Sequence, residues 1–103
     1  MKGGMQQLMK QANQLQLKIK KMQEEMGTRE YEASAGGEAV TVRVLGEAKL
    51  LSITISEDLM KSGDVEMLQD LVLTAANEAL RKAKETQASE MEKVTGGFNF
   101  PGL

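Results

Sequence analysis

Two residue types that carry much of enzyme chemistry, histidine and cysteine, are missing from this chain of 103 residues, and tryptophan is missing as well. Their absence excludes histidine general bases, cysteine nucleophiles, thiolate metal sites and disulfides. The Gly36-Gly37-Glu38 segment also lacks the GxxxxGK[ST] spacing of a phosphate-binding loop. We therefore expect no enzyme activity, no cofactor, no metal and no small-molecule substrate.

Long apolar runs are missing as well. No segment approaches the roughly 20 apolar residues of a membrane span, and the N-terminal segment MKGGMQQLMK lacks the apolar core of a signal peptide. We expect a cytoplasmic protein that makes no membrane contact. With 103 residues, 41% of them apolar, the chain is expected to form one domain over residues 1–103, small enough that oligomerisation would help to stabilise it.

Carboxylates are absent from residues 1–23, although the whole chain carries a net charge of −2. This segment contains five lysines, whereas the remaining residues contain eight Lys or Arg against fifteen Asp or Glu. Its apolar residues recur at alternating steps of three and four, which predicts a helix over about residues 5–26 with a coiled-coil-like stripe. We expect this stripe to form a helix seam or a dimer-packing surface, and it consists of Met5, Leu8, Ala12, Leu15, Ile19, Met22 and Met26.

The pattern changes to a period of two over about residues 29–56, which predicts three short strands joined by turns. Gly36-Gly37 suits a tight two-residue hairpin turn. A second long helix is expected over about residues 65–94, followed by a mobile tail over residues 96–103. The sequence thus predicts an α+β fold in the order α-β-β-β-α, in which helices cover the apolar face of a three-stranded antiparallel meander.

The lysines of the first helix lie among amides and have no carboxylates between them, so they form a surface suited to anions. If the anion is a nucleic acid, the presence of only three aromatic residues favours duplex DNA over single strands, because no base-stacking platform is evident. Lysine lacks the planar fork of arginine, so low or modest sequence specificity is expected. A solvated coiled-coil face is the alternative interpretation. The candidate contacts on this helix are Lys10, Lys18, Lys20, Lys21 and, for an adenine edge, Gln14.

A second basic cluster, Arg81, Lys82 and Lys84, lies in the second long helix, where Glu78 and Glu85 are close enough in sequence for intrahelical ion pairs. Ion pairing within the helix is therefore one interpretation of this cluster. An extension of the positive surface is the other, if the two long helices are neighbours.

Taken together, these residues resemble the YbaB/EbfC family of bacterial nucleoid-associated proteins. The resemblance covers nearly the whole chain and runs through three segments, LMKQANQLQLKIKKMQEEM, GGEAVTVRVLGEAKLLSITISEDL and EMLQDLVLTAANEALRKAKETQASEMEKVTGG. It implies a tweezer-like homodimer that binds duplex DNA through the first helix and the distal part of the last. Gene regulation and organisation of the bacterial nucleoid are the implied roles. A coiled-coil adaptor or scaffold whose first helix recruits a protein partner is the rival hypothesis.

Overall fold

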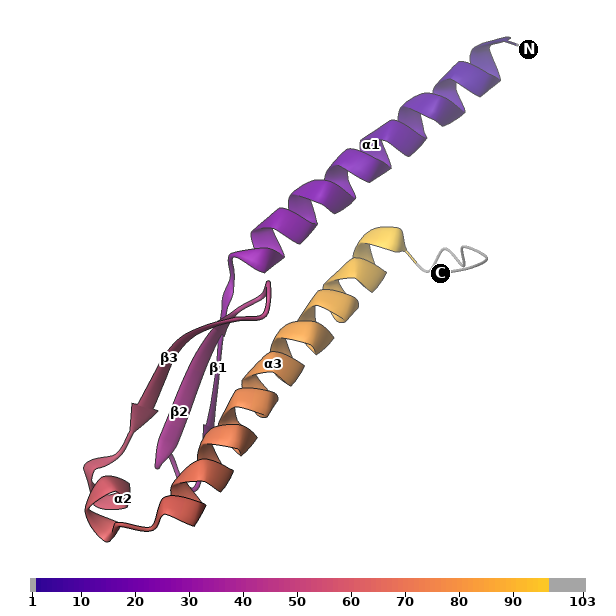
Figure 1. Cartoon of the computed structure of the whole chain (residues 1–103). Helices are drawn as coiled ribbons and strands as arrows, with labels where there is room; N and C mark the ends of the chain where they lie inside the picture. Colours follow the sequence, from indigo (N-terminus) through magenta and orange to yellow (C-terminus); the bar gives the residue numbers. More distant parts are fainter. Residues whose placement is uncertain (1, 97–103) are drawn as a thin grey trace.

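The computed structural model describes residues 2–96, with side chains from residue 3 onward, and confirms the predicted α+β architecture. A short helix, α2, precedes the last long helix, and the predicted mobile tail beyond Gly96 lies outside the described residues. The elements in chain order (Figure 1) are α1 (Lys2–Gly27), β1 (Glu30–Ala35), β2 (Val40–Leu45), β3 (Lys49–Ile55), α2 (Glu57–Ser62) and α3 (Val65–Thr95).

The three strands form one antiparallel sheet in the order β1-β2-β3. The prediction of a two-residue turn at Gly36-Gly37 was wrong, because strand pairing ends at Ala35 and Val40 and leaves four residues to connect them. Three consecutive residues of this connection have positive φ angles: Gly36, Gly37 and Glu38. The next connection has three residues, 46–48, and its last, Ala48, has a φ of 66°.

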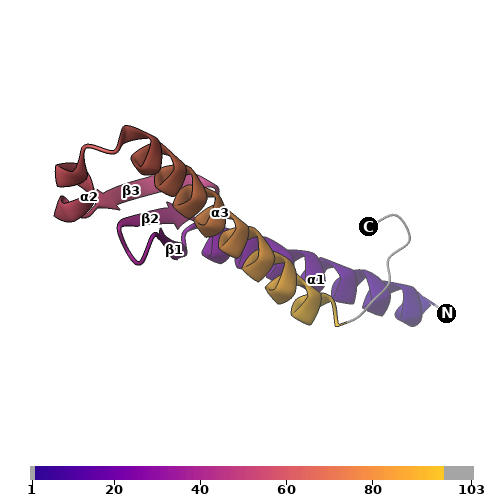
Figure 2. The same ribbon diagram turned by 90° about the horizontal axis from the view of Figure 1, so that it is seen from below.

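Helix α3 covers β1 and β2 and forms the core with them (Figure 2). The buried residues of β2 are its alternating valines, which share one face of the sheet because side chains alternate along a strand. Alanines from successive turns of α3 face them, and their small side chains allow helix and sheet to approach closely. This contact consists of Val40, Val42 and Val44 against Ala75, Ala79 and Ala83. Full burial of a valine contributes about 1.5–3 kcal/mol relative to exposure.

Strand β3 extends the sheet past the edge of this helical cover. Ile53 pairs with Val42 and therefore points to the α3 side of the sheet, yet it is 46% exposed. The expectation that helices cover the whole apolar face was therefore wrong for β3. An apolar groove remains between β3 and α3, lined mainly by Ile53, Ile55, Leu68, Val72, Leu73 and Ala76.

Both long helices differ at their ends from the expectation. Helix α1 begins at Lys2 rather than near Met5 and runs through Gly27, which has no positive φ angle. Instead, the hydroxyl of Thr28 donates to the carbonyl oxygens of Glu24 and Glu25, at 3.4 and 3.1 Å, and satisfies the last turn. Helix α3 does end in a left-handed residue, Gly96, whose N–H donates to Glu92 at 3.1 Å.

Candidate nucleic-acid interface

Helix α1 leaves the body of the molecule at one end of the sheet and extends beyond the end of α3 (Figure 1). Its 26 residues correspond to a length of about 39 Å. At its base, Met26 is only 2% exposed. The seam residues therefore differ along the helix: Met26 is buried, Leu15, Ile19 and Met22 are half-buried, and Met5, Leu8 and Ala12 are exposed. The seam packs within the chain only toward the base of α1.

The base of α1 is fixed by hydrogen bonds to the turn between β2 and β3. The N–H of Glu47 donates to the carbonyl oxygen of Gly27 at 3.1 Å, and that of Gly46 donates to Arg29 at 2.9 Å. Gln87 of α3 donates from Nε2 to the carbonyl oxygen of Gly46 at 2.6 Å. The turn thus joins α1, the sheet and α3, and so sets the direction in which α1 projects.

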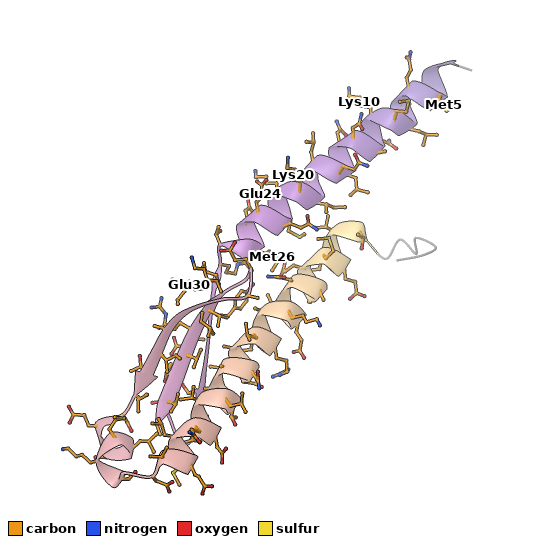
Figure 3. The ribbon with its side chains drawn as sticks, in the orientation of Figure 1. Met5, Lys10, Lys20, Glu24, Met26 and Glu30 are labelled. Carbon is orange, nitrogen blue, oxygen red and sulfur yellow. The ribbon has the colours of Figure 1, made fainter. Side chains whose placement is uncertain are left out.

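The four candidate lysines of α1 are all exposed. Figure 3 shows Lys10 and Lys20 on the side of α1 turned away from α3. Among the described residues, none of Lys10, Lys18, Lys20 and Lys21 takes part in an ion pair. Gln14 is exposed on the same helix. The lysines therefore present their full charge to solvent, on a helix separated from the acidic body.

The second basic cluster has a different environment. Arg81 lies between two carboxylates of its own helix: Nε donates to Glu78 at 3.0 Å, and a terminal nitrogen is 2.7 Å from a carboxylate oxygen of Glu85. Hydrogen bonding from Arg81 lowers the pKa of the Glu78 carboxyl, and the two carboxylates raise the pKa of the Arg81 guanidinium. Lys82 donates to the carbonyl oxygen of Glu32 in β1 at 3.0 Å.

Arg81 and Lys82 are therefore both occupied by contacts within the chain. The sequence predicted the intrahelical ion pairs of Arg81 as one of its two interpretations. Lys84 is exposed and, within the described part of the chain, forms no ion pair. Lys82 lies beside β1, whereas the lysines of α1 lie beyond the end of the sheet (Figure 1). The charged surface of α1 is thus the more available of the two.

Sequence reasoning missed several exposed apolar residues, which include two features that bear on function. The groove between β3 and α3 was missed because β2 and β3 have the same alternating pattern, although only β2 is covered. The other is Leu17, which is 67% exposed on α1. Its signal was present in the sequence, since Leu17 does not belong to the stripe of steps of three and four.

Residues 2–96 include no helix that is both long and apolar enough to cross a membrane. The same range contains no group of three or more histidine, cysteine, aspartate or glutamate side chains arranged to hold a metal ion.

A solved structure of an uncharacterised protein, HP0035 of Helicobacter pylori, has a similar fold. The two share a TM-score of 0.70 at 20% identity, over 84% of this chain and 91% of the other. At that identity the similarity shows the fold alone.

Curated relatives are considerably closer in sequence. A nucleoid-associated protein of Clostridium kluyveri is 50% identical over 98% of this chain and 89% of its own length. One from Desulforamulus reducens is 50% identical over 100% of this chain and 98% of its own length. One from Thermoanaerobacter pseudethanolicus is 53% identical over 93% of this chain and 86% of its own length. The model of the YbaB/EbfC DNA-binding family matches residues 1–98, so the chain belongs to this family, which is one of DNA-binding proteins rather than enzymes.

Proposed function

We propose that this protein binds duplex DNA as a homodimer, with low or modest sequence specificity, and thereby helps to organise the bacterial nucleoid and to regulate genes. Phosphate contacts from α1 supply most of the affinity in this proposal, with Lys84 of α3 as a further contact. The single domain over residues 1–103 acts without a cofactor. Membership of the DNA-binding family and the names of the relatives support this function.

The observation that carries the proposal is the set of four exposed lysines on α1 that make no ion pair among the described residues. Exposed lysines cost little to bring against phosphate because no internal partner has to be given up. Their release of condensed counterions from DNA favours binding. The acidic remainder of the chain opposes close approach elsewhere, so α1 is the part that faces the duplex.

The apolar groove between β3 and α3 supports the homodimer. Ile53 and Leu73, on opposite sides of this groove, are 46% and 62% exposed. Strand β3 is also an edge of the sheet, with backbone groups available for pairing. A second copy offers the same apolar groove and the same edge, and a twofold axis brings such self-complementary surfaces together. In this arrangement each protomer supplies the cover that the other lacks.

A salt titration tests the function. Affinity for a short duplex, measured by fluorescence anisotropy, is expected to fall with salt along a line of slope about −0.9 for each phosphate neutralised, on logarithmic axes. Substitution of Lys18, Lys20 and Lys21 together by Glu is expected to weaken binding to every duplex while the dimer persists. An affinity that did not respond to salt would contradict phosphate binding.

The exposed half of the seam favours one alternative, a coiled-coil adaptor. Met5 and Leu8 project from the free end of α1 and are available to a partner helix. In that case the lysines only keep the helix solvated. A protein that shows no affinity for duplex DNA even at low salt would favour the adaptor over the DNA-binding function.

A further inference from the structure

Leu17 is an exposed apolar side chain on the lysine-bearing side of α1. Its neighbours on the seam, Leu15 and Ile19, are half-buried, whereas Leu17 is 67% exposed. Two residues along an α-helix correspond to a rotation of about 200°. Leu17 therefore lies nearly opposite the seam, where packing against the described residues does not account for it.

The surface around Leu17 is polar and contains no carboxylate in direct contact along the helix. Residues three and four positions away are neighbours on a helix surface. For Leu17 these are Asn13, Gln14, Lys20 and Lys21, and all four are exposed. Because successive residues are rotated by about 100°, Lys20 and Lys21 flank Leu17 on opposite sides. An apolar side chain thus occupies the middle of a surface of lysines and amides.

We propose that Leu17 contacts the C5-methyl group of thymine in the major groove while the flanking lysines contact phosphates. This inference rests on the proposed binding of duplex DNA through α1. A helix with its side chains is about 10–12 Å across, which fits a major groove about 12 Å wide but not a minor groove about 6 Å wide. The middle of the inserted face then meets the base edges, and its margins meet the two backbones.

The chemistry of the major groove identifies the base. Guanine, cytosine and adenine present hydrogen-bond donors and acceptors there, whereas thymine adds a methyl group. A leucine side chain forms no hydrogen bonds, so the thymine methyl is the apolar partner available to it. Leu17 accordingly gives α1 a preference for thymine without base-specific hydrogen bonds. The affinity is expected to rise about fourfold for each methyl group that Leu17 covers, because burial of one group of this size contributes a free energy that corresponds to this factor.

Paired duplexes test this contact directly. One duplex contains thymidine and the other has deoxyuridine at the same positions, so that the two differ only in the C5-methyl groups. Wild-type protein is expected to bind the uracil duplex about fourfold more weakly per contacted methyl, by anisotropy titration at one salt concentration. Leu17→Ala is expected to bind both duplexes equally, and circular dichroism checks that α1 stays helical.

Leu8→Ala is the matched control, because Leu8 is a leucine of the same helix and is 65% exposed, but on the seam. It is expected to keep the wild-type ratio between the two duplexes. Equal binding of both duplexes by wild-type protein would overturn the inference and leave DNA binding intact. A Leu17→Ala variant that kept the wild-type ratio, or a Leu8→Ala variant that abolished it, would also overturn the inference. Wild-type protein that bound neither duplex would overturn the proposed function itself, and this contact with it.

Discussion

The carbonyl oxygen of Met26 lies where the side chain of residue 46 would begin. A Cβ atom placed on Gly46 would be 1.8 Å from that oxygen and 2.7 Å from Nε2 of Gln87. The backbone atoms of the α1 terminus and of the β2–β3 turn are thus in contact without room for a methyl group. Gly46 is required here for close approach, and its φ angle is not among the positive ones.

Gly46→Ala is therefore expected to destabilise the fold by about 2–3 kcal/mol, because a backbone segment rather than a flexible side chain has to move. Urea unfolding followed by circular dichroism measures this change. Gly27→Ala is the control at the same junction, since a Cβ there would be 4.0 Å from the Cβ of Glu47, an ordinary van der Waals separation. Alanine is favoured over glycine within a helix by about 0.5–1 kcal/mol, so this control is expected to be neutral or stabilising.

Ile53→Glu is expected to prevent formation of the proposed homodimer, because it places a charge in the apolar groove between β3 and α3. Sedimentation velocity reports the change in mass. Thr54→Glu is the matched control, since the neighbouring residue of β3 points to the opposite face of the sheet. A dimer that survived Ile53→Glu would locate the contact between protomers elsewhere.

Lys20→Glu is expected to weaken DNA binding and to make the slope of the salt dependence shallower by about 1 for each phosphate that is no longer neutralised. The physical reason is that Lys20 is exposed on α1 and, among the described residues, has no carboxylate partner. Lys61→Glu changes the net charge by the same amount on α2, where Lys61 is 3.9 Å from Glu57. Anisotropy titrations at several salt concentrations compare the two. An equal weakening in both variants would indicate a general effect of charge rather than binding through α1.

The Glu78–Arg81 pair predicts a small acid-dependent contribution to stability. Hydrogen bonding from Arg81 lowers the pKa of Glu78 from its ordinary value of 4.5. Because the folded pKa is the lower one, the pair stabilises the fold above about pH 4.5, and this contribution disappears as the pH falls through the folded pKa. Glu78→Gln is expected to remove that part of the acid dependence.

Urea midpoints measured at about pH 6 and about pH 3 test this expectation. The wild-type protein should lose more stability over this interval than Glu78→Gln does. Glu57→Gln, which removes a solvent-exposed carboxylate near Lys61, is the control. An identical pH profile for wild type and Glu78→Gln would show that the pair contributes nothing measurable to stability, as is common for exposed ion pairs.

Local patterns were sufficient to predict the order of the two long helices and the three strands. The alternation of Val40, Val42 and Val44 and the apolar spacing of α3 each specify which face is apolar, and these faces meet in the core. The same kind of alternation in β3 does not indicate whether helix α3 also covers this strand. Ile53 is exposed only because α3 passes over β1 and β2, which is a property of tertiary packing.

In the candidate site, too, the sequence predicted the local features but not those that depend on tertiary contacts. Composition located the lysines on α1, but only the contacts of Arg81 and Lys82 with Glu78, Glu85 and Glu32 distinguish engaged cations from available ones. The predicted length of the connection between β1 and β2 was wrong. That length depends on where the two strands stop pairing, which is at Ala35 and Val40. A glycine pair alone does not determine that register.

Helix α1 is anchored at one end only, so a small rotation at that end moves its free end through a much larger distance. Its base is held at Gly27 and Met26, while among the described residues its free end makes only the hydrogen bonds of the helix itself. Over a length of about 39 Å, a tilt of a few degrees at the base displaces the tip by several ångströms. A small change at the base would therefore move every lysine of α1 beyond it, and amide protons should exchange progressively faster from Met26 toward Met5.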